Sequence, residues 1–202
     1  NELNIPPPGD IRNCMIALAD SEAIMQSLMD YRFPGTGDLK GHNFGNLLIA
    51  AMADLSGSFE KGIQQAGQFL AIRGRVLPAS LERVTLAAET TTTKKVIGES
   101  KIGGLRDPIK RVYLLNKVKA FQESINAITA ADLIVIGPGS LFTSIVASLL
   151  IPGISNAIAK SSAVTIYISN LAVQNGETLS FTLDDHIQTI CNYMGPATPD
   201  VV

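Results

Sequence analysis

The amino-acid sequence predicts an α/β protein with a parallel sheet in its C-terminal half. Residues 133–136 form an apolar run that stops at a glycine turn, and an apolar helical segment follows. A second apolar run at 164–169 comes after a short helical segment at 156–160, and a helical pattern at 184–193 comes last. A strand–helix–strand order of this kind requires a right-handed crossover, which places the two strands parallel.

The N-terminal segment is predicted to contain two helices. Residues 4–9 include three prolines and a glycine, which exclude both a helix and a central strand. Asp10 follows as the expected N-cap of a helix at 11–19. A second helix restarts at residues 20–21, and the spacing of its apolar residues predicts a buried face made of Ile24, Leu28 and Tyr31.

A loop and two further helices are expected next. Residues 34–41 contain three glycines and predict the loop. The segment 45–55 is apolar nearly all round, which is typical of a buried helix. Ser58 is expected to cap the following helix, whose buried face is predicted to consist of Phe59, Ile63, Ala66 and Leu70.

The middle of the chain changes to strand-like patterns. Short runs rich in β-branched and apolar residues predict strands at 73–77, 83–88, 96–99 and 111–115. Residues 90–93 are four threonines that form a polar tip between two of these strands, which predicts a β-hairpin. A helix is expected at 118–128.

Composition predicts a packed cytoplasmic protein. Of the 202 residues, 46% are hydrophobic and 17% are charged, and the formal net charge is −2, so we expect no basic face for nucleic acid. No apolar run approaches the roughly 20 residues of a membrane span, and the polar start at residues 1–3 is unlike a signal peptide. Cys14 and Cys191 are expected to be reduced, buried thiols. Because no long linker interrupts the chain, a single domain is expected over residues 1–202.

The turn between the first C-terminal strand and its helix is the main candidate for a ligand site. Gly137 and Gly139 precede Ser140 where the helix at 141–150 begins, and such a junction presents backbone N–H groups and a positive dipole end to an anion. Ser140 and Thr143 add hydroxyl groups. The motif is not the dinucleotide fingerprint, because Phe142 stands at the third glycine position, and it is not a P-loop, because it has no Gly-Lys-Ser/Thr. The alternative is a simple tight turn in which Ser140 caps the helix.

Two polar segments near the N-terminus are further candidates. Asp10, Arg12 and Asn13 lie in the first turn of a helix behind the prolines, where an anion or a base edge can be met. The alternative is that Asp10 only caps its own helix. These residues are therefore predicted to bind ligand, and Asp10 is also a weak acid–base candidate.

The second of these segments contains His42, Asn43 and Asn46 between glycines, directly before the buried helix. The alternative is that an asparagine caps that helix. No second histidine stands at metal-ligand spacing, so we expect no metal site. His42 is the other weak acid–base candidate.

Asn170 and Gln174 follow the second C-terminal strand. In open α/β sheets, ligands lie at the carboxyl ends of the strands, so both side chains are expected to face the same region as residues 137–140. The acidic pair that begins the last helix is more simply explained as capping, by Thr182 or Asp184.

Together these motifs resemble one family. In order they are Pro-Pro-Gly-Asp-Ile-Arg-Asn (7–13), Tyr-Arg-Phe (31–33), Lys-Gly-His-Asn-Phe-Gly-Asn-Leu-Leu (40–48), Arg-Gly-Arg-Val-Leu-Pro (73–78), Ile-Gly-Glu-Ser (97–100) and Ala-Asp-Leu-Ile-Val-Ile-Gly-Pro-Gly-Ser-Leu-Phe-Thr-Ser-Ile (131–145). The chain resembles the YvcK-like gluconeogenesis factors, which share a superfamily with the CofD-type 2-phospho-L-lactate transferases.

The resemblance implies a Rossmann-like three-layer α/β/α fold with a mostly parallel sheet and a small β-hairpin insertion. It implies that a ligand cleft is lined by the motif residues Asp10, Arg12, Asn13, His42, Asn43, Asn46, Gly137, Gly139, Ser140, Thr143, Asn170 and Gln174. Family members normally begin with a strand and a Gly-Gly-Gly-Thr-Gly phosphate loop, and Asn1 already lies downstream of both. The chain is therefore expected to lack that unit. Residues 174–178 read Gln-Asn-Gly-Glu-Thr where the family usually has Gln-Pro-Gly-Glu-Thr.

The function that the resemblance implies is that of a cytoplasmic regulatory protein of carbon metabolism and cell-shape maintenance, which binds a nucleotide-sugar or a dinucleotide such as a UDP-sugar or NAD. In this hypothesis residues 137–140 hold a phosphate and residues 42–46 close over the sugar or base. The alternative is a Mg²⁺-dependent transferase that moves a phosphorylated group from a nucleotide-linked donor, with Asp10 as its acid. A third hypothesis is a scaffold that acts through protein partners, as a homo-oligomer formed through strands 83–115.

Overall fold

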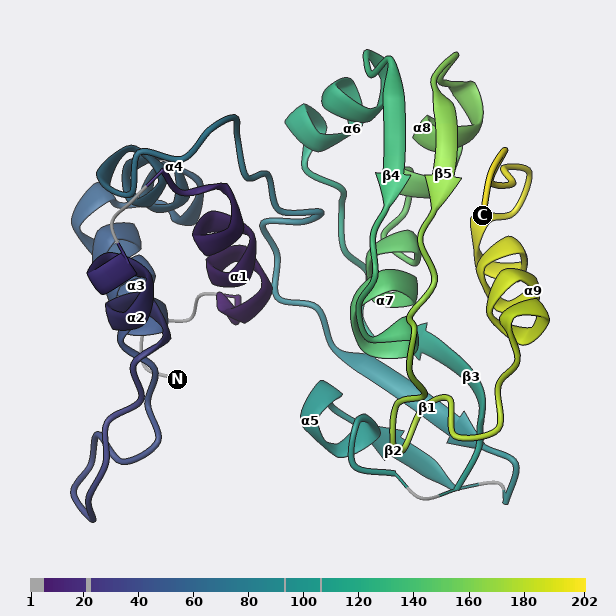
Figure 1. Ribbon diagram of the computed structural model, residues 1–202, viewed down its shortest axis with the longest axis horizontal. Coiled ribbons are helices and arrows are strands. Elements are labelled where there is room, and N and C mark those ends of the chain that lie inside the picture. The colour runs from purple at the N-terminus through teal and green to yellow at the C-terminus, as the bar shows by residue number, and fades with distance from the viewer. Residues whose placement is uncertain (1–5, 21–22, 93, 106) are drawn as a thin grey trace. The chain divides into compact units, whose positions relative to one another are not determined.

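The computed structural model describes residues 6–20, 23–92, 94–105 and 107–202 (Figure 1). The chain divides into two compact units, Asn1–Arg83 (unit 1) and Val84–Val202 (unit 2). Predictions that fall on Asn4, Ile5, Ser21 and Thr93 lie outside the described residues. The mixed α/β class is confirmed, whereas the single domain over 1–202 stays a prediction.

The helices in the described part of unit 1 are α1 (Gly9–Leu18), α2 (Ala23–Asp30), α3 (Phe44–Ser56) and α4 (Phe59–Phe69). The expected cap of α4 is confirmed, because Ser58 Oγ accepts a hydrogen bond from the Lys61 N–H at 3.2 Å. The expected cap of α1 is wrong: α1 begins at Gly9, and no side chain caps it. Asp10 therefore lies inside the first turn, where its negative charge still suits the positive end of the helix dipole.

The core of unit 1 gathers on one face of each helix, and its fully buried members are Met15, Met29, Ile49, Ile63, Ala66 and Leu70. The buried face predicted for the second helix is wrong. Ile24 is 72% exposed, and Leu28 and Tyr31 are also exposed, whereas Met29 is fully buried. The periodic pattern gave the right helix but the wrong face because Met25 and Met29, one turn apart, make the contacts with the core.

Unit 2 contains an antiparallel sheet with the strand order β2-β1-β3. Its strands are β1 (Leu86–Thr90), β2 (Lys95–Ile97) and β3 (Ile109–Leu114), and β1 pairs antiparallel with both neighbours. The predicted hairpin at the threonine tip is confirmed. A mostly parallel sheet is not found in the described parts of the chain, because so short a connection from β1 to β2 permits only antiparallel pairing. No strand forms at 73–77.

The predicted parallel pair is confirmed further along unit 2. Strand β4 (Leu133–Ile136) runs parallel to β5 (Val164–Tyr167), with Leu133 opposite Val164. The carboxyl ends of both strands point toward α7 (Figure 1). The helices of this unit are α5 (Glu99–Ile102), α6 (Gln122–Thr129), η1 (Leu141–Val146), α7 (Ala147–Leu149), α8 (Ile154–Lys160) and α9 (Leu183–Met194).

Two helix starts in unit 2 bear on the site. Helix α9 begins with a capping box in which Thr182 and Asp185 each accept a hydrogen bond from the other's backbone N–H, so Thr182 rather than Asp184 is the cap. The segment predicted as one α-helix begins as the π-helix η1, because the Ile145 N–H donates to the Ser140 carbonyl five residues earlier at 3.0 Å. Short π-helical turns are frequent at functional sites.

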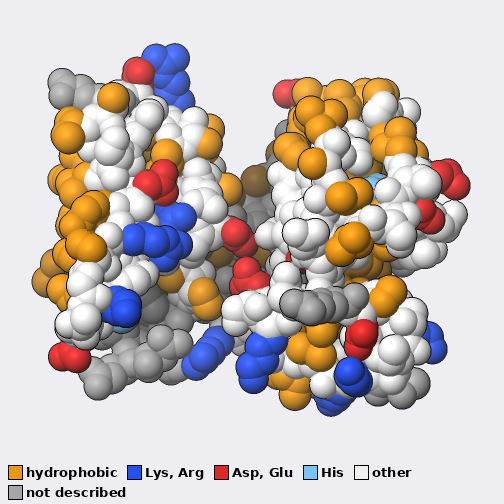
Figure 2. Space-filling view, turned by 60° about the horizontal axis from the view of Figure 1, so that its bottom comes forward, with side chains coloured by type: hydrophobic (Ala, Val, Ile, Leu, Met, Phe, Trp, Pro, Cys, Tyr) orange, Lys and Arg blue, Asp and Glu red, His pale blue; other side chains and the backbone are white. Residues whose placement is uncertain are grey.

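Hydrophobic side chains remain on the surface of both units (Figure 2). Within the described ranges no single helix is long and apolar enough to cross a membrane. The segments Leu141–Leu149 and Ile154–Lys160 reach that length only together, across a bend of 68°. Cys14 and Cys191 are free thiols. The expectation that both are buried is wrong: Cys191 is half-buried and Cys14 is exposed. Cys14 is exposed because the buried side of α1 is made by Arg12 and Met15.

Buried His186 is expected to make the stability of unit 2 depend on pH. The side chain is 4% exposed, its Nδ1 lies 3.3 Å from Tyr167 Oη, and its ring meets the edge of Phe181. Burial lowers the pKa of His186, against the opposite effect of Asp185. The unfolded chain therefore binds this proton at a higher pH than the folded chain does. The stabilisation is complete above the ordinary histidine pKa, about 6.5, and is lost as pH falls below it.

The measurement is urea unfolding of the wild type and of His186→Phe at about pH 7.5 and about pH 5.5, on either side of the ordinary histidine pKa. The wild type is expected to lose more stability on acidification than the variant, which has no titrating ring at this position. An equal loss in both proteins would contradict the assignment.

Candidate functional site

Arg12 organises the polar residues of unit 1. Its side chain is buried, with 8% of the residue exposed. The two terminal nitrogens donate to Asn46 Oδ1 at 3.3 Å and to Asn13 Oδ1 at 2.6 Å. The Arg12 Nε lies 3.7 Å from a carboxylate oxygen of Asp30. The structure thus brings together Arg12 and Asn46, which are 34 residues apart in the chain and which the sequence predicts to share a site.

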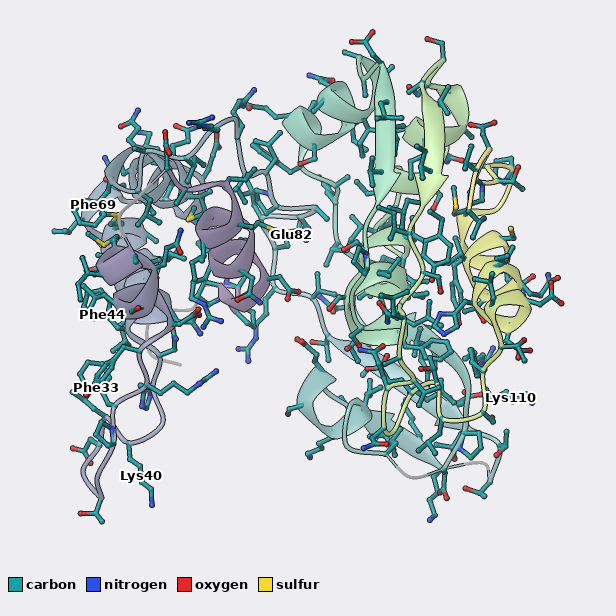
Figure 3. All side chains as sticks on the ribbon, in the orientation of Figure 1. Phe33, Lys40, Phe44, Phe69, Glu82 and Lys110 are labelled. Atoms are coloured by element: carbon teal, nitrogen blue, oxygen red, sulfur yellow. The ribbon has the colours of Figure 1, made fainter. Side chains whose placement is uncertain are left out.

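Asn43 holds the start of α3 next to this arginine. Its Oδ1 accepts a hydrogen bond from the Asn46 N–H at 3.0 Å, which makes Asn43 the N-cap of α3. Figure 3 labels Phe44 where α3 begins, and Phe33 and Lys40 on the loop that precedes it. The capping alternative is therefore confirmed for Asn43. We call Arg12, Asn13, Asn43 and Asn46 the Arg12 cluster.

Asp10 and His42 do not join the Arg12 cluster through any hydrogen bond or ion pair in the described structure. Both residues are exposed. The backbone of His42 is ordered by two hydrogen bonds, from its N–H to the Leu39 carbonyl and from the Phe33 N–H to its own carbonyl. No contact selects either side chain for proton transfer, so their acid–base role stays a prediction.

In unit 2, Asn170 holds the glycine turn. Its Oδ1 accepts from the Gly139 N–H at 3.0 Å, and its Nδ2 donates to the Gly139 carbonyl at 2.7 Å. The same Nδ2 lies 3.2 Å from Gln174 Oε1, which also accepts from the Leu141 N–H at 3.1 Å. The expectation that Asn170 and Gln174 face the turn is met, but they face it as internal partners of its backbone. Gly137 has open space where a side chain would be.

Glu177, which sequence reasoning did not select, occupies the start of η1. Its carboxylate is buried, with 6% of the residue exposed. One oxygen accepts from the Phe142 N–H at 2.8 Å. The other accepts from Ser140 Oγ at 2.5 Å and from Thr143 Oγ1 at 3.0 Å. We call Asn170, Gln174 and Glu177 the turn clamp, because their side chains bind residues 139–143.

The turn clamp changes the chemistry expected of this turn. The backbone donors at Gly139, Leu141 and Phe142, which were predicted to meet a phosphate, donate to side chains of the same chain. A carboxylate already stands where the helix dipole favours a negative charge. A second anion placed beside Glu177 would be repelled by it. The turn is therefore better suited to neutral groups, which can form hydrogen bonds with the hydroxyls of Ser140 and Thr143, than to an anion.

The backbone that carries Glu177 packs closely against another segment of unit 2. Gly176 has φ +85° and approaches the backbone so closely that a Cβ would lie 2.5 Å from the Leu105 carbonyl oxygen. Asn175 and Gly176 also line a cavity of about 460 Å³ with residues 103–105 and Leu179. A glycine is thus required one residue before Glu177. The Gly-Glu pair at 176–177 was the sequence signal that could have identified the carboxylate.

Asn170→Ala is expected to destabilise unit 2 by about 1–2 kcal/mol, because it leaves the Gly139 N–H and carbonyl without their partner. Urea unfolding followed by circular dichroism measures the change. Asn192→Ala removes the exposed amide that accepts from Gln188 on α9 and is expected to change stability by no more than about 0.5 kcal/mol. Equal effects of the two substitutions would show that Asn170 does not hold the turn.

The two groups of predicted site residues lie in different units. The Arg12 cluster belongs to unit 1, and the turn with its clamp belongs to unit 2. Within each unit the sequence-predicted residues come together, apart from Asp10, His42 and Gly137. That both groups serve one ligand stays a prediction.

Comparison with known proteins gives consistent matches along the chain. The family model described as 2-phospho-L-lactate transferase CofD matches residues 1–202. A protein of Halalkalibacterium halodurans named "Gluconeogenesis factor" is 45% identical over 200 residues, which cover 98% of this chain and 62% of that protein. The Bacillus subtilis protein of the same name is 43% identical over 203 residues, which cover 100% of this chain and 64% of that protein.

A solved structure matches equally well. A crystal structure of a Bacillus halodurans protein superposes with a TM-score of 0.93 at 44% identity and covers 99% of this chain and 65% of that chain. A second crystal structure from that organism, described as a member of the UPF0052 family, gives 0.92. The chain thus spans less than two thirds of the length of these relatives.

Proposed function

The chain belongs to the CofD family, and on that premise we propose that it acts on a nucleotide-linked, phosphate-bearing ligand in carbon metabolism. The observation that carries the proposal is that motif residues far apart in the sequence form hydrogen-bonded clusters at two helix starts, one in each unit. Relatives named gluconeogenesis factor support the metabolic setting. The Rossmann-like three-layer arrangement and a cytoplasmic location are parts of the same proposal.

Two forms of this function remain to be distinguished by experiment. In the first, the protein binds a UDP-sugar or NAD and acts as a regulator. The neutral amides of Asn13, Asn43 and Asn46 favour this form, because amides suit hydroxyls and base edges. In the second, the protein transfers a phosphorylated group from a nucleotide-linked donor. The description of the family model as a transferase favours this second form.

The second form implies Mg²⁺ as a cofactor. Among the described side chains, no three from His, Cys, Asp and Glu come together closely enough to hold a metal ion. Because Mg²⁺ is commonly held by one or two carboxylates together with the phosphates of its substrate, the requirement for Mg²⁺ is part of the second form and is tested with it.

The test is calorimetric titration of the chain with a UDP-sugar and with NAD, followed by incubation of each donor with Mg²⁺ and detection of products by phosphorus NMR. Binding without turnover supports the regulatory form, and turnover supports the transferase. Asn43→Ala and Ser140→Ala are each expected to weaken binding at least about tenfold, because a tenfold change in Kd corresponds to the free energy of about one buried hydrogen bond. No heat of binding at millimolar ligand would reject the proposal.

A further inference from the structure

The Arg12 cluster gathers positive charge at two helix starts. Arg12 is the fourth residue of α1, and its side chain lies against the first turn of α3, where a Cβ on Gly45 would be 2.8 Å from Arg12 Cδ. The start of a helix carries a partial positive charge, so a cation is normally disfavoured there. Unit 1 nevertheless buries a guanidinium at this place.

Two buried donors in this cluster have no hydrogen-bond partner. Arg12 Nε and Asn43 Nδ2 are both inaccessible to solvent and make no hydrogen bond in the described structure. A buried donor without a partner costs roughly 1–3 kcal/mol, and such groups often mark the position of an ion or ligand. Arg12 makes two hydrogen bonds, both from its terminal nitrogens, although a guanidinium carries five N–H donors.

The negative charge nearby is insufficient to balance this arrangement. Asp30 approaches Arg12 Nε at 3.7 Å, beyond hydrogen-bonding distance, and its side chain is 62% exposed. The oxygens that accept from Arg12 belong to the neutral amides of Asn13 and Asn46. The cluster is therefore electropositive, in contrast to the turn of unit 2, where the Glu177 carboxylate already occupies the helix start.

From these observations the structure assigns an anion-binding site to the Arg12 cluster of unit 1. The sequence predicts a phosphate at the glycine turn and, for Arg12, either an anion or a base edge. The nature of the complete ligand rests on the proposed function, but the binding of an anion at Arg12 does not. The class of group that fits is a phosphate or pyrophosphate, because a guanidinium presents paired donors to it.

The test titrates the chain with inorganic pyrophosphate. Asp30→Asn removes the carboxylate that pairs with Arg12 and is expected to tighten binding about three- to tenfold. Asp20→Asn is the matched control, since it makes the same change of charge at the exposed pair of Asp20 with Arg73, and it is expected to alter binding less than about twofold. Arg12→Lys keeps the charge but loses the planar donor geometry, and a weakening of about tenfold is expected.

Circular dichroism establishes that each variant is folded. If Arg12→Lys does not fold, the comparison of Asp30→Asn with Asp20→Asn still decides the test. The inference is overturned if Asp30→Asn and Asp20→Asn act alike, or if Glu177→Gln, which removes the carboxylate at the turn, tightens pyrophosphate binding more than Asp30→Asn does. Pyrophosphate binding that follows the expected pattern, with no binding of any nucleotide, would leave this inference standing while the proposed function fails. Nucleotide binding that is insensitive to Arg12→Lys would support the proposed function and overturn this inference.

Discussion

Glu177→Ala is expected to destabilise unit 2 by about 3–4 kcal/mol. The substitution removes the acceptor of the Phe142 N–H and of two hydroxyls, on Ser140 and Thr143. Hydrogen bonds to a charged acceptor contribute about 1.5–3 kcal/mol each, but the two hydroxyls can turn to new partners or to water, so their loss is only partial. The Phe142 N–H is buried and cannot do so.

Urea unfolding followed by circular dichroism measures this loss, and amide hydrogen exchange at Phe142 locates it. Glu177→Gln keeps an amide oxygen for the Phe142 N–H and is expected to lose about half as much. Glu89→Ala is the matched control in the same unit, because it removes a partly exposed carboxylate bound to Arg111, and a much smaller change is expected there. Unchanged exchange at Phe142 in Glu177→Ala would show that the carboxylate does not hold the turn.

Elements with local signals were predictable from the sequence. Ser58 and Thr182 cap the helices that they precede, and the apolar run at 133–136 forms the strand with those limits. These features depend on neighbours within one or two turns of chain. Two assignments were wrong because the contacts that decide them lie outside the local segment. The face of α2 is decided by the core that it meets, and the π-helical start of η1 is decided by the partners of Ser140.

The sequence predicted which residues belong to the candidate site, but it did not predict what each of them does there. The sequence predicts that Ser140, Thr143, Asn170 and Gln174 share a place, and the structure brings them together through the turn clamp. Its central member, Glu177, bonds to Phe142 across 35 residues, a contact that no local pattern reports. A glycine turn before a helix indicates where an anion is favourable. It does not indicate whether the protein supplies that anion itself.

The same reasoning applies to Arg12. Its place in the first turn of a helix suggested a side chain that projects into solvent or toward a ligand. The structure buries it, because Gly45 of α3 leaves room for its aliphatic carbons. That space arises between two helices separated by the whole of α2 and its loop, so only the folded unit reveals it.

Gly62→Ala is expected to destabilise unit 1 by about 1–2 kcal/mol, the net of overpacking and helix propensity. Helices α3 and α4 cross so closely that a Cβ at Gly62 would lie 2.5 Å from both Cα and N of Ala53. Those atoms are backbone, so the clash cannot be relieved by turning a side chain and the helices must separate. Overpacking of this kind typically costs 1–3 kcal/mol or more, against a gain of about 1 kcal/mol in helix propensity.

The matched control is Gly67→Ala in the same helix. A Cβ there would meet Ile72 Cδ1 at 2.9 Å, and that atom is the mobile end of a side chain. The propensity gain of about 1 kcal/mol is then offset only by a small rearrangement, so near-neutral or slightly positive stability is expected. Thermal unfolding of both variants by circular dichroism makes the comparison. If Gly62→Ala were as stable as Gly67→Ala, α3 and α4 would not be in the close backbone contact at Gly62 and Ala53.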